Sequence, residues 1–221
     1  MSTTLILFLG VILALVLGGI GLYLLYQILV NFNPGKKRVQ EDIKKMREEL
    51  APWIAELVPW NKDEMELFSL NQIHQTVKKG ISRTAKGVYT SIYHEPMLAY
   101  AYKEYVAPGT NAVLYVRTSK HEFVYRLRNK GIQIAMDGKA IGTIDEEMKL
   151  YGGKKNRLLA RIHRPTDEEI PLLLPVVVND REVASLVNPA LANSPNPRAF
   201  EFLKDDLQPD EENLLMALAA L

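Results

Sequence analysis

The residues with the clearest potential for chemistry are basic side chains in the middle of the chain. Six of them make up the candidate site: Arg126, Arg128, Lys154, Lys155, Arg157 and Arg161. Lysine and arginine donate charge-assisted hydrogen bonds to phosphate oxygens, so a patch of them suits anionic or phosphoinositide lipid headgroups. The patch forms only if the two strands that carry the four arginines are neighbours. The alternative is a solvated sheet face whose cations protect strand edges.

Catalytic and metal-binding patterns are absent from the sequence. The segment Gly152-Gly153-Lys154-Lys155 lacks the spacing and the hydroxyl residue of a P-loop, and no G-x-S-x-G nucleophile motif occurs. The four histidines form no ligand pair at helical spacing, and the absence of cysteine excludes disulfides and thiolate metal sites. With a formal net charge of +1, no overall charge favours nucleic acid. We therefore expect a non-enzymatic protein without a metal, a cofactor or a nucleic-acid partner.

Residues 1–33 predict a transmembrane anchor. No charged side chain occurs from Thr4 to Val30, a stretch longer than the roughly 20 apolar residues that cross a bilayer core. A cleaved signal peptide is the alternative. Such a peptide has a basic start, a shorter apolar run and small residues at its cleavage site, whereas Met1-Ser2-Thr3-Thr4 contains no basic residue. We therefore expect one permanent membrane span.

Basic residues next to the span predict its orientation. Lys36, Lys37 and Arg38 follow the span closely, whereas no lysine or arginine precedes it. Because positively charged flanks stay in the cytoplasm, the N-terminus should lie outside the cell membrane and the rest of the chain inside. The same three cations are candidates for contact with anionic membrane lipids.

Small residues within the span predict contact with a second helix. Gly10, Ala14 and Gly18 recur every four residues, so they share one helix face on which another helix can approach closely. The partner would be another membrane protein or a second copy of the chain. The alternative is that glycine and alanine are common in membrane helices without any such role.

A helical neck is expected over residues 34–79. Its first helix, over 36–50, carries a narrow apolar stripe of Val39, Ile43, Met46 and Leu50. This stripe packs either on the globular domain or a second copy, or else the helix lies on the membrane with its basic residues on lipid headgroups. We favour packing, because a narrow stripe resembles a helix–helix seam more than a membrane-buried face. A connecting helix is expected over residues 61–79.

From about residue 80 to residue 221, the pattern is that of a mainly β domain. Short segments rich in β-branched and aromatic residues alternate with turns, over residues 88–93, 97–105, 112–117, 121–127, 132–136, 140–144, 157–164, 170–178 and 182–187. Asp137-Gly138, between two of these segments, is typical of a two-residue hairpin. This regular spacing predicts an antiparallel sandwich or barrel of roughly 10–12 strands.

The C-terminus departs from the strand pattern. A short helix is expected over residues 198–203, and a last helix begins at Pro209, with acidic residues in its first turn. From Asn213 to Leu221 this last helix is apolar on every face, so it must be buried, and it is too short to span a membrane. The interior of a closed β-barrel would bury it.

Three segments resemble the tubby C-terminal domain. Phospholipid scramblases and plant LURP-one-like proteins have the same kind of β-barrel. The three segments are the hairpin Gly138-Lys139-Ala140-Ile141-Gly142-Thr143-Ile144, its weaker echo Asp180-Arg181-Glu182-Val183-Ala184-Ser185-Leu186, and the ending Asp210-Glu211-Glu212-Asn213-Leu214-Leu215-Met216-Ala217-Leu218-Ala219. The resemblance covers residues 80–221 and implies an antiparallel β-barrel around an apolar C-terminal helix, in a non-enzymatic module for anionic or phosphoinositide headgroups. Scramblases differ in having a C-terminal membrane helix and a cysteine cluster, so scrambling activity is not implied.

Two functions fit these expectations. The first is a membrane-anchored adaptor or accessory subunit of a membrane protein complex, which presents a cytoplasmic barrel. The second is a protein that binds anionic lipid headgroups, or handles lipids, through its basic face. Salt-sensitive binding to anionic liposomes would favour the second function over the first.

Overall fold

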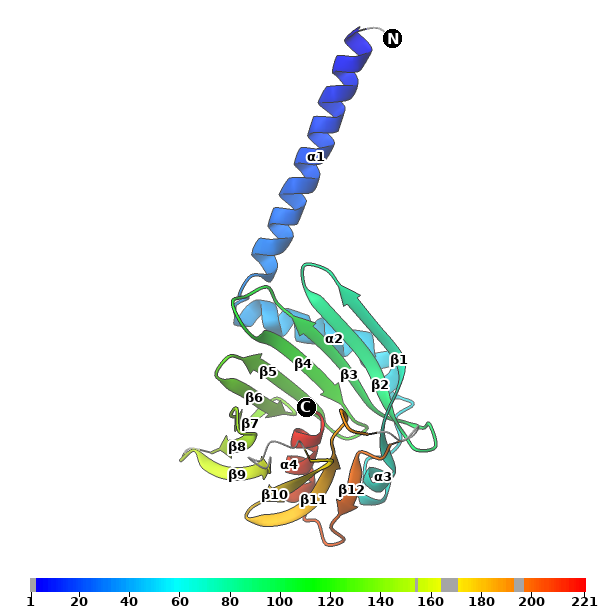
Figure 1. Ribbon diagram of the computed structural model, residues 1–221, viewed down its shortest axis with the longest axis vertical. Coiled ribbons are helices and arrows are strands. Elements are labelled where there is room, and N and C mark those ends of the chain that lie inside the picture. The colour runs from blue at the N-terminus through cyan, green and yellow to red at the C-terminus, as the bar shows by residue number, and fades with distance from the viewer. Residues whose placement is uncertain (1–2, 154, 164–170, 193–196) are drawn as a thin grey trace.

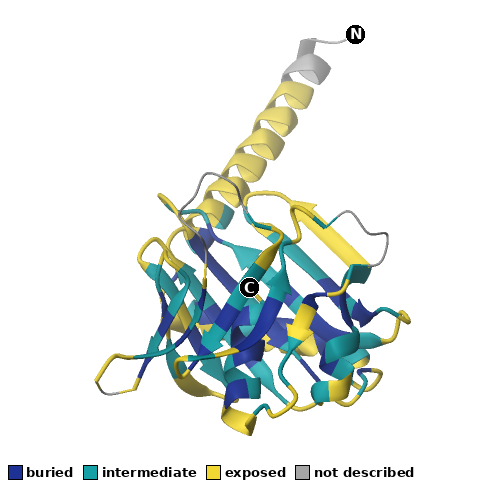
Figure 2. Cartoon of the chain, turned by 60° about the horizontal axis from the view of Figure 1, so that its bottom comes forward, coloured by how far each residue is buried: buried dark blue, intermediate teal, exposed yellow. Residues whose placement is uncertain are grey.

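The computed structural model describes residues 3–153, 155–163, 171–192 and 197–221, and the side chains from residue 8 onward. Its first element, α1 (Thr3–Asn31), projects away from the rest of the chain (Figure 1). The stretch Phe8–Asn31 has a mean hydropathy of 2.5, and its side chains are exposed except near its end, where Asn31 is buried (Figure 2). At 1.5 Å per residue it is about 36 Å long, which exceeds the roughly 30 Å of a bilayer core. The predicted apolar helix of membrane-spanning length is therefore confirmed.

One antiparallel sheet of twelve strands forms the body of the protein, and each strand pairs with the next along the chain. The strands are β1 (Phe68–Lys79), β2 (Arg83–Ser91), β3 (Pro96–Glu104), β4 (Asn111–Arg117), β5 (Glu122–Arg128), β6 (Gly131–Met136), β7 (Lys139–Ile144), β8 (Lys149–Gly152), β9 (Arg157–Ile162), β10 (Leu173–Val178), β11 (Arg181–Val187) and β12 (Phe200–Leu203). The predicted mainly β fold is confirmed.

The sheet curls into a nearly closed barrel. The start of β1 meets the segment that precedes β12, where the backbone N–H of Ala199 donates to the carbonyl of Phe68 at 2.8 Å. Ser69 and Arg198 form an isolated antiparallel bridge beside this bond. Within the described residues, β1 and β12 make no longer ladder with each other, so closure depends on this short contact.

The last helix, α4 (Pro209–Ala219), lies inside the barrel. A capping box starts it, in which the backbone N–H of Gln208 donates to the Glu211 carboxylate at 3.0 Å. Leu215 and Leu218 are at most 1% exposed and belong to the main apolar core, to which all the strands except β2 contribute buried side chains. Burying one such leucine contributes about 2 kcal/mol. The predicted apolar helix within the barrel is therefore confirmed.

The neck helix, α2 (Lys36–Ile54), covers the outer face of the barrel over β3 and β4. Its stripe residues Val39, Met46 and Leu50 are buried in a second apolar cluster, together with Val113 and Tyr115 from β4. The preferred prediction, that the stripe packs on the globular domain, is confirmed. The chain thus forms three layers, with a helix outside, a sheet, and a helix inside.

Two predicted helices are wrong. Residues 61–79 contain only the short helix α3 (Lys62–Leu67), and residues 68–79 form β1, so the sheet begins earlier than residue 80. Ile73 of β1 packs on the α2 cluster, and the imidazole of His74 stacks on Trp53 at 5.6 Å. Residues 198–203 contain β12, whose Phe200 enters the main core. Pairing with β2 and β11 therefore outweighs the local helical spacing in both segments.

Candidate functional site

The end of α1 is fixed to one rim of the barrel by backbone hydrogen bonds. The N–H of Val106, in the β3–β4 loop, donates to the carbonyl of Asn31 at 3.1 Å, and the N–H of Asn33 donates to the carbonyl of Val106 at 3.1 Å. Because consecutive strands are antiparallel, the β1–β2 turn lies at the same end of the sheet as this loop. We call this end of the barrel the α1 rim, defined by residues 79–83 and 105–110 (Figure 1).

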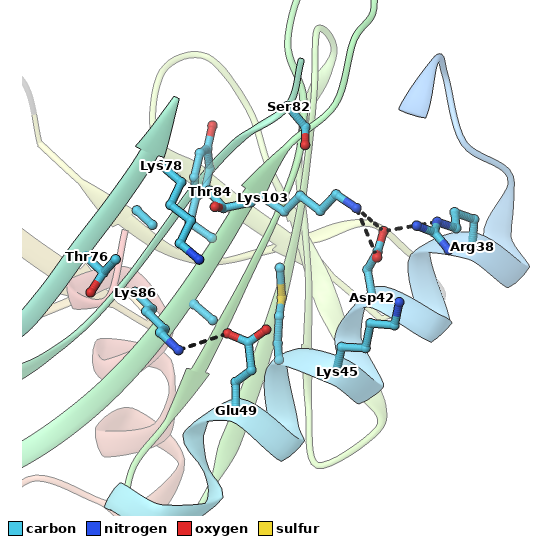
Figure 3. A pocket seen from close by; sticks show the side chains of 14 residues that line it. Arg38, Asp42, Lys45, Glu49, Thr76, Lys78, Ser82, Thr84, Lys86 and Lys103 are labelled. Carbon is cyan, nitrogen blue, oxygen red and sulfur yellow. Dashed lines mark hydrogen bonds and ion pairs between the residues drawn. The ribbon is translucent and has the colours of Figure 1, made fainter. Parts of the chain in front are cut away.

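A groove of about 250 Å³ lies between α2 and strands β1 to β3 on the outside of the barrel (Figure 3). Charged side chains from α2 form one wall: Arg38, Asp42, Lys45 and Glu49. Because these positions are four, three and four residues apart, they share a helix face beside the apolar stripe. The strands provide the other wall, with Lys78 on β1, Lys86 on β2 and Lys103 on β3, among hydroxyl side chains such as Thr76 and Thr84.

Asp42 is the buried carboxylate of the groove, with 4% of its side chain exposed. The ammonium of Lys103 donates to both of its oxygens at 3.0 Å, and the hydroxyl of Tyr105 donates to it at 2.8 Å. Burial raises the pKa of Tyr105, and the negative charge of Asp42 raises it further, so this hydroxyl remains a donor at neutral pH. A buried carboxylate requires such partners, so Asp42 and Lys103 are committed to holding α2 on the sheet.

The remaining charges leave the groove positive. Lys86 donates to Glu49 at 3.1 Å, whereas Lys45 and Lys78 make no ion pair within the described part of the chain. The lining contains five basic and two acidic side chains, and Arg38 has a further partner in Glu41 outside the lining, so the positive charges of Lys45 and Lys78 are the two left without an ion pair among the described residues. An amine from the helix and an amine from the strand are therefore available on opposite walls. This arrangement can bind an anion with several oxygens, such as a phosphate group.

The prediction that the arginines of β5 and β9 form one shared patch is wrong. Arg126 and Arg128 lie on β5, Arg157 and Arg161 lie on β9, and three further strands separate the two. The residues therefore do not share a neighbouring pair of strands, which was the condition for a common patch. Lys155 is exposed in the turn before β9, and Lys154 lies outside the described residues.

Arg126 has a structural role instead. Its guanidinium donates to the carbonyl of Ala112 at 2.6 Å and to the side chain of Asn111, and it lies 5.4 Å from the ring of Tyr105. Burial lowers the pKa of Arg126, and the nearby charge of Arg128 lowers it further. The guanidinium is thus occupied by the protein itself.

Of the three cations that follow the apolar helix, only Arg38 lines the groove. It lies 3.4 Å from Glu41 and 3.7 Å from Asp42, whereas Lys36 and Lys37 are exposed at the start of α2. The groove also contains lysines that the sequence analysis missed: Lys45, Lys78, Lys86 and Lys103. The regular spacing of Arg38, Asp42, Lys45 and Glu49 was a visible indication of a charged helix face. The contribution of β1 was hidden, because the apolar residues of this strand have a loose helical spacing.

Comparisons of the chain with protein-family models, with curated proteins and with solved structures found no match. The resemblance to the tubby and scramblase barrels therefore stays a prediction. Among the described residues, no group of three histidine or acidic side chains is placed to hold a metal ion.

Proposed function

We propose that this protein is a single-pass membrane protein whose barrel binds an anionic lipid headgroup in the groove between α2 and the β1–β2 hairpin. The observation that carries the proposal is the position of Lys45 and Lys78, neither of which has an ion pair among the described residues, on facing walls of a groove with excess positive charge. The proposal assigns no catalytic role to the site. It keeps the class of ligand that the tubby-like resemblance implies, but it moves the site from β5 and β9 to α2 and β1.

The surroundings of α1 support the membrane part of the proposal. None of the described residues covers its exposed apolar surface, and such a surface is stable only in lipid or against a partner. Lys36, Lys37 and Arg38 then favour a cytoplasmic barrel and an outer N-terminus. In that orientation the groove opens beside the anionic cytoplasmic leaflet.

The groove chemistry favours phosphate groups over simple counterions. Lys45 and Lys78 offer three donors each, and the hydroxyl groups of Thr76 and Thr84 lie among them. Each charge-assisted hydrogen bond to an anion contributes about 1.5–3 kcal/mol. Two lysines that contact one phosphorylated headgroup would thus give binding that depends strongly on salt.

Calorimetric titration of the full chain in phosphatidylcholine nanodiscs tests the proposal, with inositol trisphosphate and inorganic phosphate as soluble probes. We expect inositol trisphosphate to bind at low salt, and Lys45→Gln with Lys78→Gln to weaken binding by about tenfold or more. Nanodiscs with added phosphatidylinositol bisphosphate should compete with the soluble probe, because the lipid would occupy the groove from the membrane side.

A matched control removes the same charge elsewhere. Lys44 is 75% exposed on the solvent side of α2, and Lys120 is exposed in the β4–β5 turn, away from the α1 rim. Lys44→Gln with Lys120→Gln should leave binding nearly unchanged. An equal loss of affinity in both double variants would show that total charge, and not the groove, determines binding. An absence of binding at low salt would contradict the headgroup proposal.

An accessory-subunit role is the second candidate, favoured by one face of α1. A side chain placed at Gly10 or Gly18 would meet no described atom within 4 Å, and the same is true at Gly19, so the recurrence of small residues rather than open space distinguishes this face. Gly10→Ile with Gly18→Ile should then abolish association with a partner helix in chemical crosslinking of native membranes. Gly19→Ile, which lies on the opposite face, is the control. Crosslinks that persist in the variant with both Gly10→Ile and Gly18→Ile would exclude this interface.

A further inference from the structure

The tip of the β1–β2 hairpin, residues 77–83, is basic and apolar at once. Val77 is 44% exposed and Ile81 is 37% exposed, although most large apolar side chains of the barrel are buried. Lys78, Lys79 and Arg83 accompany them, and the tip contains no acidic residue. None of these three cations forms an ion pair with any residue that the structure describes.

The strand register places this tip level with the end of α1. Thr84 on β2 pairs with Lys103 on β3, so Arg83 and Glu104 occupy the next row toward the α1 rim. Ile81 lies two residues beyond Arg83, and Val106 lies two residues beyond Glu104. Because Val106 is hydrogen-bonded to Asn31, the register puts Ile81 about level with the last residue of α1. Figure 1 shows the β1–β2 turn beside the end of α1.

We propose that the β1–β2 tip is a second membrane-contacting element, which inserts Ile81 into the interface of an anionic bilayer next to α1. This inference depends on the membrane anchor in the proposed function, but not on a ligand in the groove. Lys79 and Arg83 would contact the lipid phosphates, while Ile81 enters the boundary of the acyl chains, as amphipathic elements do at interfaces.

The charge of the tip favours a membrane over a second copy of the chain. Three unpaired cations on each tip would repel one another in a symmetric contact, whereas an anionic leaflet attracts them. Contact at both α1 and the tip would also prevent the barrel from rotating freely about α1. The groove between the hairpin and α2 would then face the headgroups in a fixed orientation.

The absence of cysteine in the natural chain permits a direct test. Ile81→Cys can be labelled with the environment-sensitive fluorophore NBD, and the full chain reconstituted in vesicles of phosphatidylcholine with or without phosphatidylserine. We expect blue-shifted emission, quenched by lipids that carry a nitroxide on the acyl chain, and more strongly so in anionic vesicles. The control is Tyr93→Cys, which is 67% exposed just past the other end of β2, about 30 Å away. Its label should remain in water.

A charge variant tests the contribution of the cations. Lys79→Gln with Arg83→Gln should lower quenching at position 81 in anionic vesicles and leave it unchanged in neutral ones, while Lys120→Gln should have no effect. Flotation of the vesicles verifies that α1 remains inserted, which separates failure of the tip from failure of the anchor. A label at position 81 that stays in water overturns the inference. A blue shift without nitroxide quenching also overturns it, since the tip would then contact protein.

Discussion

The ammonium of Lys103 on β3 donates to both carboxylate oxygens of Asp42 on α2, at 3.0 Å each. The side chains are 13% and 4% exposed, so both charges lie largely outside bulk water. Each charge is tolerated because the other is present, and the pair joins the outer helix to the sheet directly beside the groove.

Loss of this carboxylate should detach or weaken α2. Asp42→Asn leaves the Lys103 ammonium buried without its counter-charge, and we expect the free energy of unfolding to fall by about 3 kcal/mol. Urea titration of the full chain in detergent micelles, followed by tryptophan fluorescence, measures it, because Trp53 reports on α2. Adding Lys103→Met should recover part of the loss.

Glu48→Gln is the control for this variant. Glu48 also lies on α2 and is 66% exposed, so its loss should change stability by less than about 0.5 kcal/mol. If Asp42→Asn costs no more than Glu48→Gln, the buried pair does not hold α2 on the barrel.

Because α4 is enclosed by the barrel, truncating one of its buried leucines should destabilise the protein. Leu215 is fully buried in α4, and Leu215→Ala should lower the free energy of unfolding by about 3 kcal/mol through lost contacts and a cavity. Leu221, 42% exposed after the same helix, serves as the comparison, and Leu221→Ala should cost less than about 0.5 kcal/mol. Equal effects in the same urea titration would contradict the enclosure of α4.

The ion pair of Arg47 and Glu122 predicts a loss of stability in acid. Arg47 donates to the two oxygens of Glu122 at 2.8 and 3.1 Å, and the hydroxyl of Tyr115 donates at 3.0 Å. Burial alone would raise the pKa of Glu122, but these hydrogen bonds outweigh it and hold the pKa below its ordinary value of 4.5. The contribution is therefore fully present above pH 4.5 and disappears as the pH falls through the lower, folded-state pKa.

Glu122→Gln should remove this part of the pH dependence. We expect the variant to be less stable than the natural chain at neutral pH, by about 1 kcal/mol because Arg47 is half exposed, and the difference to shrink in acid. Urea midpoints measured from about pH 7 to pH 3 give the comparison. A difference that stays constant, or grows in acid, would show that Glu122 does not act through its charge.

Strands β7 and β8 approach each other so closely at Gly142 that a larger side chain there should destabilise the barrel. A Cβ at Gly142 on β7 would collide with the backbone carbonyl of Tyr151 on β8, so Gly142→Ala should destabilise the barrel by about 2 kcal/mol. At Gly80 the nearest atom is 3.8 Å away, and Gly80→Ala should be tolerated. Thermal unfolding of both variants, followed by circular dichroism, tests the contrast. Similar melting temperatures would mean that β7 and β8 do not approach so closely.

Features that depend on neighbours along the chain can be predicted from the amino-acid order. The uncharged run up to Val30 gave a helix of membrane-spanning length, and Asp137-Gly138 gave a hairpin turn whose φ angles are +50° and +76°. The burial of the last helix could be predicted because it is apolar on every face, and such a helix is unstable in water. These properties follow from local geometry and hydrophobicity alone.

Contacts between residues that are distant along the chain depend on how the strands pair and pack. Residues 68–79 fit a loose helical spacing, and they became β1 because pairing with β2 and contact with α2 stabilise the extended form. The pairing order separated β5 from β9 and so divided the expected arginine patch. The groove combines Lys45 of a helix with Lys78 of a strand, and no pattern along the chain encodes that distance. Strand pairing and burial are properties of the whole fold, so they fix a site that local sequence could not.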